Sequence, residues 1–146
     1  MPFLATLLIL LSCGYSSKGI EGDQVILITL DTIRADHVGC YGYQNIETPN
    51  LDHIASEGVL FRNAICTIPL TLPSHATMMT GLYPLKHGVR SNLIYRLSEP
   101  SVTVAEILKE NGYETGAVIS ALPLAKRFGL AQGFDFFEES FLEEFL

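Results

Sequence analysis

The sequence predicts an α/β fold with a mostly parallel sheet, and three observations lead to that prediction. A short apolar run at 25–29 has the composition of a strand that is buried on both faces of a sheet, and residues 113–120 predict another buried strand. Segments with helical spacing and glycine stops alternate with these strands, as the crossovers of a parallel sheet do. The apolar fraction of 48% over 146 residues suffices for one packed domain.

The first half of the chain supplies a strand, a helix and a second strand, in that order. The strand 25–29 is followed closely by Asp31, and ligands of such sheets bind beyond the carboxyl ends of the strands. "TPNLDHIASEG", residues 48–58, opens with Thr-Pro and stops at a glycine, which predicts a short helix. "VLFRNAICTI", residues 59–68, predicts the second strand.

The second half supplies two helices and a third strand. Residues 74–80 predict a helix that begins after Pro73 and ends at Gly81, followed by a loop with the sequence "LYPLKHG". "SVTVAEILKENG" predicts the next helix, with Ser101 as its cap, and the strand 113–120 follows. No strand is predicted in "GFDFFEESFLEEFL", and three strands are few for an open sheet. We therefore expect the chain to be a fragment of a larger fold.

The N-terminal segment is predicted to be an export signal. Residues 2–12 are apolar but fall far short of the roughly 20 residues that span a bilayer. "LLSC", which ends at Cys13, resembles a bacterial lipoprotein cleavage box, so 1–12 would be removed and 13–23 would form a tether. A buried N-terminal strand or helix is the alternative. The lipoprotein prediction places the chain in the bacterial cell envelope, anchored to a membrane by lipid on Cys13, or in the periplasmic or extracellular space.

Charge and cysteine content narrow the classes of function. The net charge of −7 argues against a nucleic-acid surface, which needs clustered lysine and arginine. Cys40 and Cys66 have no spacing typical of a metal site. Two interpretations of these cysteines stay open, a disulfide in an oxidising envelope or two small buried thiols.

Three side chains form the candidate site. Thr71 places a hydroxyl two residues before Pro73, at the mouth of a helix whose N–H groups and dipole favour an anion. Such a hydroxyl is a poor nucleophile until a metal or a base activates it. Asp31 is the candidate metal ligand, because a carboxylate at a strand end suits a divalent cation. His75 is placed to orient the hydroxyl or to donate to a developing oxyanion.

Each of these residues also has a plainer interpretation. Thr71 and Asp31 are common turn residues, and Ser74 is a common residue at a helix start. His75 and His87 are surface imidazoles in this interpretation. Spacing alone therefore indicates an anion site and nothing more specific.

Long stretches of the chain resemble a known family. "VILITLDTIRADHVGCYGY", "TPNLDHIASEGVLFRNAICTIPLTLPSHATMMTGLYPLKHGV" and "GYETGAVIS" with "RFGLAQGFDFF" resemble the N-terminal part of sulfatases, in the alkaline phosphatase superfamily. The resemblance implies an alkaline-phosphatase-like α/β/α sandwich that hydrolyses sulfate or phosphate esters with a hydroxyl-type nucleophile bound to a divalent metal. It places Asp31 at the first metal-binding aspartate and Thr71 at the nucleophile, which also contacts the metal. Calcium is the first expectation for that metal, with zinc and manganese as alternatives.

The chain departs from the family pattern at three places. Thr32 stands where typical sulfatases have a second aspartate. Residues 71–75 occupy the Cys-x-Pro-Ser-Arg motif, whose cysteine is oxidised to formylglycine, and Thr71 cannot be converted in that way. Residues 119–122 replace a Gly-Lys-Trp-His segment that binds the sulfate. Arg127 either restores some of the lost positive charge or is simply solvated.

The leading hypothesis is a metal-dependent sulfuric ester hydrolase with Thr71 as nucleophile, Asp31 as metal ligand and His75 as helper. One alternative is a phosphodiesterase or phosphoryl transferase of the same superfamily, in which threonine itself attacks. The other is a non-catalytic remnant or fragment, because the family's remaining metal ligands lie beyond residue 146. The implied partners are a sulfate or phosphate ester and, through the lipid, a membrane.

Overall fold

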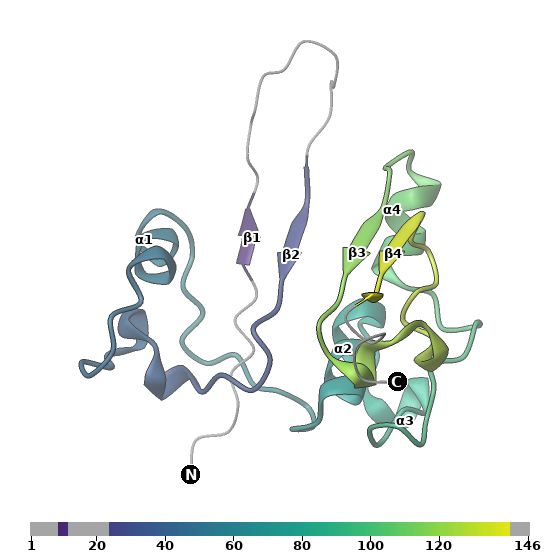
Figure 1. Ribbon diagram of the computed structural model, residues 1–146, viewed down its shortest axis with the longest axis horizontal. Coiled ribbons are helices and arrows are strands. Elements are labelled where there is room, and N and C mark those ends of the chain that lie inside the picture. Colours follow the sequence, from purple (N-terminus) through teal and green to yellow (C-terminus); the bar gives the residue numbers. More distant parts are fainter. Residues whose placement is uncertain (1–8, 12–23, 141–146) are drawn as a thin grey trace. The chain divides into compact units, whose positions relative to one another are not determined.

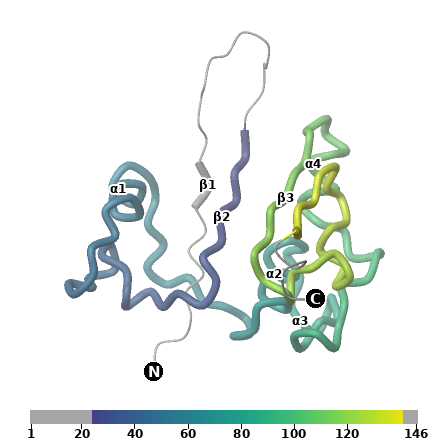
Figure 2. The backbone as a smooth tube through the Cα atoms, viewed as in Figure 1, coloured from purple at the N-terminus to yellow at the C-terminus, as the bar shows by residue number. Residues whose placement is uncertain are grey.

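Contacts along the chain divide it into two units. The computed structural model describes residues 9–11 and 24–140 (Figure 1). One unit spans Met1–Cys66 and the other spans Thr67–Leu146. Helices and short strands occur in both, and Figure 2 follows the backbone through them. The predicted α/β class is confirmed as a mixed α/β fold with a small parallel sheet, whereas a single larger sheet is absent from the described residues.

The Met1–Cys66 unit contains a two-stranded antiparallel sheet. Strand β1 (Ile9–Leu11) pairs with strand β2 (Ile26–Ile28), with Ile9 opposite Ile28. The predicted strand 25–29 is therefore present, but its expected place in a parallel sheet covered on both faces is wrong within the described residues. The side chains from Val25 to Ile28 are 38 to 52% exposed. An apolar strand becomes buried only when a layer packs on each face, and β1 alone adds one hydrogen-bonded edge.

The predicted helix of this unit is confirmed as α1 (Pro49–Glu57). Proline stands at the first helical position, where its missing N–H costs no hydrogen bond. The helix ends at Gly58, whose N–H donates to the carbonyl of Ile54 at 2.9 Å. Two short 3₁₀ helices, Ala35–His37 and Gly39–Tyr41, precede α1.

The strand predicted at 59–68 is wrong. This segment has no ladder hydrogen bonds in the structure and turns at Arg62 and Asn63. Its apolar side chains point outward, with Phe61 at 65% and Ile65 at 89% exposure. A β-branched run forms a strand only beside a pairing partner, and asparagine favours the turn that interrupts this run.

The Thr67–Leu146 unit contains three α-helices and a parallel strand pair among its described residues. The helices are α2 (Thr71–Thr80), α3 (Pro84–His87) and α4 (Val104–Glu110). Strand β3 (Gly116–Val118) pairs in parallel with β4 (Phe136–Glu138), with Gly116 opposite Phe136. Two 3₁₀ helices connect the strands, at Leu122–Leu124 and Lys126–Phe128.

Two elements of this unit correct the sequence predictions. The segment "LYPLKHG" is not only a loop, because α3 starts at Pro84, a residue suited to the first helical position. The segment "GFDFFEES" contains β4, although no strand was predicted there. The strand forms because β3 offers a hydrogen-bonding edge about twenty residues earlier in the chain. Local sequence does not reveal such a partner.

Helix α4 is capped by Thr103, and the predicted cap at Ser101 is wrong. The Thr103 hydroxyl accepts from the backbone N–H of Glu106 at 3.2 Å. The Glu106 carboxylate in turn accepts from the backbone N–H of Thr103 at 2.7 Å. This reciprocal pair is a capping box, which satisfies two N–H groups that the helix itself leaves unpaired. Ser101 lies two residues too early to take part.

The hydrophobic core of the Thr67–Leu146 unit is built around α2. Leu72 and Ala76, which project from one face of this helix, are fully buried. Residues from the later part of the chain complete the cluster, namely Val89, Leu97, Leu124, Ala125, Phe128 and Leu130. The first turn of α2 is therefore fixed by packing on its inner face.

Several predictions concern the N-terminus and the cysteines. Cys13, the proposed signal and the tether lie outside the described residues apart from β1, so the lipoprotein assignment stays a prediction. Cys40 is a free thiol, and both Cys40 and Cys66 are half-buried. No described helix has the length and apolar character needed to cross a membrane.

Candidate active site at the start of helix α2

Helix α2 begins at Thr71, three residues earlier than predicted. Leu70, in extended conformation, is the cap residue, and its carbonyl accepts from the N–H of Ser74 at 3.0 Å. Thr71 is thus the first helical residue, and the proline lies inside the first turn. Proline is tolerated there because an N–H at that position has no partner within the helix. The prediction that the helix starts after Pro73 was wrong, because a proline is tolerated anywhere in the first turn of a helix and not only at the first helical position.

The N–H groups at this helix start are largely engaged, which changes the expected anion site. The N–H of Leu72 donates to the side-chain oxygen Oδ1 of Asn92 at 2.9 Å. Pro73 has no N–H, and Ser74 already donates to Leu70. The backbone of these three residues therefore offers little to an anion. Side-chain donors have to supply most of any oxyanion contact here.

Asn92 contacts the start of α2, which the sequence did not predict. Its Oδ1 accepts from Leu72, so its side-chain amide nitrogen carries two further donors beside the helix start. The residue stands in the turn after α3, twenty-one positions beyond the candidate nucleophile. An asparagine in a Ser-Asn turn gives no local signal of this contact. Only the pairing of the turn with α2 shows it.

The structure brings Thr71 and His75 together one helical turn apart. Residues at this spacing lie on the same face of a helix. The Nδ1 atom of His75 donates to the backbone carbonyl of Thr71 at 2.8 Å, because a carbonyl oxygen only accepts. In the neutral ring the other nitrogen, Nε2, is then an acceptor. Both residues are half-buried, so His75 is not the surface imidazole of the plainer interpretation.

Asp31 lies three residues after the end of β2, in a turn of the Met1–Cys66 unit. Its Oδ1 accepts from the backbone N–H of Thr32 at 3.0 Å. Thr32 has a φ of 62°, which is unusual for a β-branched residue. Asp31 belongs to the Met1–Cys66 unit and Thr71 to the Thr67–Leu146 unit. The expected proximity of the two side chains stays a prediction.

A divalent cation needs more ligands than the described residues gather. Calcium takes six to eight oxygen atoms, and magnesium-like ions take six. No group of three or more His, Cys, Asp or Glu side chains is assembled among the described residues. Asp31 is therefore not part of such a group among the described residues, and its role as a metal ligand stays a prediction.

The structure shows the exposure of two other residues considered in the sequence, Arg127 and His87. Arg127 is exposed and lies over the ring of Phe128, with 5.0 Å between the guanidinium carbon and the ring centroid. This position agrees with a solvated arginine. His87 is buried, with 4% of its surface exposed, so its interpretation as a surface imidazole is wrong.

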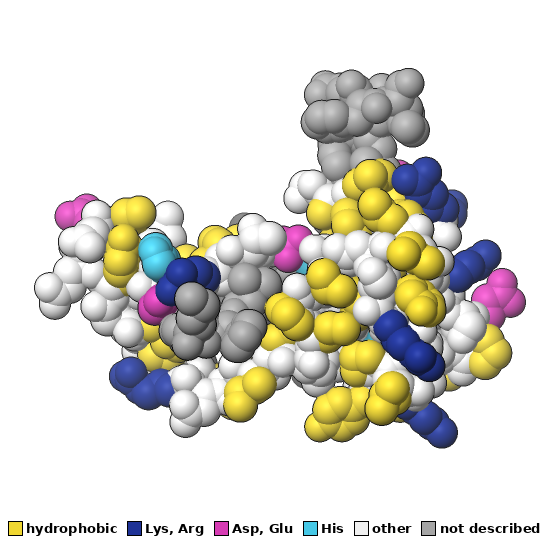
Figure 3. All heavy atoms as spheres, turned by 90° about the horizontal axis from the view of Figure 1, so that it is seen from below, with side chains coloured by type: hydrophobic (Ala, Val, Ile, Leu, Met, Phe, Trp, Pro, Cys, Tyr) yellow, Lys and Arg dark blue, Asp and Glu magenta, His cyan; other side chains and the backbone are white. Residues whose placement is uncertain are grey.

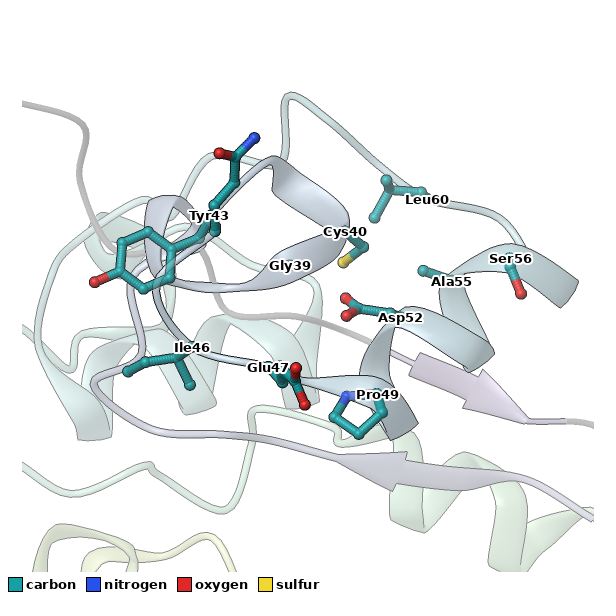
Figure 4. A pocket seen from close by; sticks show the side chains of 11 residues that line it. Gly39, Cys40, Tyr43, Ile46, Glu47, Pro49, Asp52, Ala55, Ser56 and Leu60 are labelled. Carbon is teal, nitrogen blue, oxygen red and sulfur yellow. The ribbon is translucent and has the colours of Figure 1, made fainter.

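An open cavity of about 570 Å³ lies in the Met1–Cys66 unit (Figure 4). Cys40 and Asp52 face each other in it, and burial together with the nearby carboxylate raises the pKa of the thiol. The Asp52 carboxylate accepts from the hydroxyl of Thr48 at 3.1 Å, and that hydroxyl accepts from the N–H of Gly39. These bonds join α1 to the preceding 3₁₀ helix. None of the predicted site residues lines this cavity.

The sulfatase family matches residues 23–143 of the chain. The chain is 32% identical over 129 residues to arylsulfatase D of Homo sapiens. This match covers 81% of this chain and 22% of the relative. It is 37% identical over 112 residues to an ulvan-active sulfatase of Formosa agariphila. That match covers 73% of this chain and 22% of the relative.

A solved structure supports the same relationship. A protein of Bacteroides thetaiotaomicron described as a sulfatase superposes with a TM-score of 0.62 at 33% identity, covering 73% of this chain and 23% of that one. The chain spans about a fifth of the length of the curated relatives it matches. The matched part corresponds to the N-terminal portion of the sulfatase fold. On this evidence the chain belongs to the sulfatase family, within the alkaline phosphatase superfamily.

Proposed function

We propose that this chain carries the nucleophile of a sulfuric ester hydrolase, and that the nucleophile is the hydroxyl of Thr71. Family membership supports the reaction class. The observation that carries the residue assignment is the start of α2, where His75 bonds to the backbone carbonyl of Thr71 and Asn92 bonds to the backbone N–H of Leu72. Threonine itself attacks in this proposal, since it is not a substrate for oxidation to formylglycine.

The roles of the chain's own residues follow from their hydrogen bonds. The Thr71 oxygen attacks sulfur, the new S–O bond forms, and the bond from sulfur to the alcohol oxygen breaks. The hydroxyl proton passes to Nε2 of His75, which the bond from Nδ1 to the Thr71 carbonyl leaves as the basic nitrogen. The leaving alcohol takes that proton. Water then attacks the sulfated threonine, restores the hydroxyl and releases sulfate.

Asn92 supplies polar donors to the ester oxygens in this proposal. Its amide nitrogen lies on the same side chain that holds the N–H of Leu72. Donors that are fixed before the reaction stabilise a developing oxyanion without reorganising. This contribution replaces part of the backbone anion site that the engaged N–H groups remove.

The divalent cation remains part of the proposal, with calcium as the first choice and zinc or manganese as alternatives. Members of the family typically use such an ion. Asp31 would contribute one carboxylate ligand, and Thr71 would contact the ion through its hydroxyl. A bound cation lowers the pKa of an oxygen nucleophile.

Threonine at position 71 also favours a second candidate function, a phosphodiesterase or phosphoryl transferase. A hydroxyl nucleophile needs no prior oxidation, and the same geometry accepts a tetrahedral phosphorus centre. Substrate preference separates the two candidates, because sulfate monoesters and phosphate diesters carry the same charge but differ in the central atom and in the second ester group that the diester carries.

The test is an assay of the full-length protein with an aryl sulfate and an aryl phosphodiester, each with calcium, zinc or manganese. Thr71→Ala is expected to lower kcat on the order of 10³-fold or more, whereas Thr71→Ser, which keeps a hydroxyl, loses much less. Preference for the phosphodiester would select the second candidate. If Thr71→Ala hydrolyses each accepted ester as fast as the parent, Thr71 is not the nucleophile.

A further inference from the structure

A buried histidine is connected to the first turn of α2 by a short chain of hydrogen bonds. The Nε2 atom of His87 lies 3.1 Å from the hydroxyl oxygen of Thr77. That hydroxyl donates to the backbone carbonyl of Pro73 at 3.0 Å. At its other nitrogen, Nδ1, His87 accepts from the N–H of Val89 at 3.1 Å. The chain of bonds thus runs from α3 to the turn that carries Thr71.

These bonds fix where the protons are. The N–H of Val89 can only donate, so Nδ1 of His87 is the unprotonated nitrogen and Nε2 carries the hydrogen. The single proton of the Thr77 hydroxyl goes to Pro73, whose carbonyl only accepts. Thr77 therefore accepts from His87, and also from the hydroxyl of Thr67 at 3.3 Å. Each donor in this series of hydrogen bonds has one acceptor. Donation runs from Val89 to His87, from His87 to Thr77 and from Thr77 to Pro73.

The first turn of α2 is consequently held at two points. Asn92 holds the N–H of Leu72 from one side, and the His87 chain holds the carbonyl of Pro73 from the other. Leu72 and Pro73 are themselves fully buried. With both neighbours fixed, the backbone of Thr71 has little freedom to rotate about the helix axis. A misplacement of about 1 Å at a reacting group can cost about 100-fold in rate.

We propose that His87 is a positioning residue for the nucleophile, because it fixes the Pro73 carbonyl through Thr77 and so the turn that presents Thr71 and His75. This inference rests on the proposed role of Thr71. It adds a residue that touches neither the ester nor the reacting atoms. The role requires an Nε2-type donor at position 87 and a hydroxyl at position 77.

Two matched pairs of variants in the full-length protein test the proposal. His87→Gln keeps a donor near the Nε2 position, whereas His87→Asn keeps an acceptor for Val89 and loses the donor to Thr77. Thr77→Ser keeps the hydroxyl, whereas Thr77→Val keeps the shape and loses it. We expect kcat to fall about 10- to 100-fold in the Asn and Val variants, with KM changed less than about twofold. The Gln and Ser variants retain most of kcat.

A second measurement is independent of catalysis. Hydrogen exchange of the Ser74 backbone amide, followed by ¹⁵N NMR, reports the first turn through its bond to Leu70. This amide is expected to exchange faster in His87→Asn and Thr77→Val than in the parent, His87→Gln or Thr77→Ser. If the parent hydrolyses no ester, the proposed function fails, and the exchange rates still decide whether His87 fixes the turn.

Melting temperatures show which variants fold. If His87→Asn does not fold, the comparison of Thr77→Ser with Thr77→Val tests the proposal. The proposal is overturned if the folded Asn or Val variant keeps parental kcat and parental Ser74 exchange. It is also overturned if His87→Gln and His87→Asn lose activity equally, since a donor at Nε2 would then be irrelevant.

Discussion

The two units differ sharply in how they bury their apolar side chains. The Thr67–Leu146 unit holds a continuous cluster of buried residues around α2, whereas Val38 is the one buried hydrophobic residue among residues 24–66 of the Met1–Cys66 unit. Strand β2 exposes side chains that its sequence suggests should be covered. Figure 3 shows further apolar side chains at the surface of the face it draws. The candidate nucleophile thus lies in the unit that is better able to stabilise itself, and the candidate metal ligand lies in the other.

The largest expected effect is the loss of the core around α2. Leu72→Ala removes a side chain with 0% exposure and should destabilise the chain by about 2 to 5 kcal/mol, because the cavity cannot fully close. Leu85→Ala, at 83% exposure, is the matched control and should change stability by less than about 0.5 kcal/mol. Urea unfolding followed by circular dichroism measures both. Equal effects of the two variants would contradict the importance of this core.

A smaller effect is expected at the cap of α4. Thr103→Ala removes the hydroxyl that accepts from Glu106 and should cost about 1 to 2 kcal/mol. Ser101→Ala, at the cap predicted from sequence, should cost less, because its hydroxyl has only a 3.4 Å contact with that of Ser98. Melting curves of the two variants, recorded side by side, rank the two residues. A larger loss for Ser101→Ala would restore the cap predicted from sequence.

The smallest expected effect is a pH dependence that comes from His87. Burial lowers the pKa of this ring, so the unfolded chain binds more protons than the folded chain below the unfolded pKa of about 6.5. The free energy of unfolding is therefore highest, as far as His87 is concerned, above that pH, and it decreases as the pH falls through the lower pKa of the folded state. Protonation of Nδ1 would also place its hydrogen against the N–H of Val89.

The measurement is the free energy of unfolding between pH 5 and pH 7 for the parent and for His87→Gln, which cannot titrate. The difference between the two should grow in favour of the parent as the pH rises, because groups common to both proteins cancel. A constant difference over this range would show that His87 has the same pKa in both states.

Sequence reasoning succeeded where a local signal was sufficient. Pro49 and Gly58 mark the ends of α1, and long motifs along the chain identified the family. It failed where a distant partner decides the outcome. The run at 59–68 lacks a pairing strand, and β4 forms because β3 pairs with it.

The candidate site shows the same division. Thr71 and His75 were predicted from local sequence, Thr71 as a hydroxyl just before a helix expected to begin after Pro73 and His75 as a residue of its first turn. Asn92 and His87 were not assigned roles, since each acts through a contact between segments ten or more residues apart. The proximity of Asp31 to Thr71 depends on how the two units pack, which no local pattern encodes.

The turn after β2 has a consequence for how this lineage can change. Thr32 has a left-handed backbone, a conformation that aspartate and asparagine adopt far more readily than a β-branched residue does. A random library at this codon, selected only for thermal resistance, should therefore enrich acidic or amide side chains beside Asp31. Selection for a more stable protein would then place a second carboxylate beside Asp31 without any selection for catalysis.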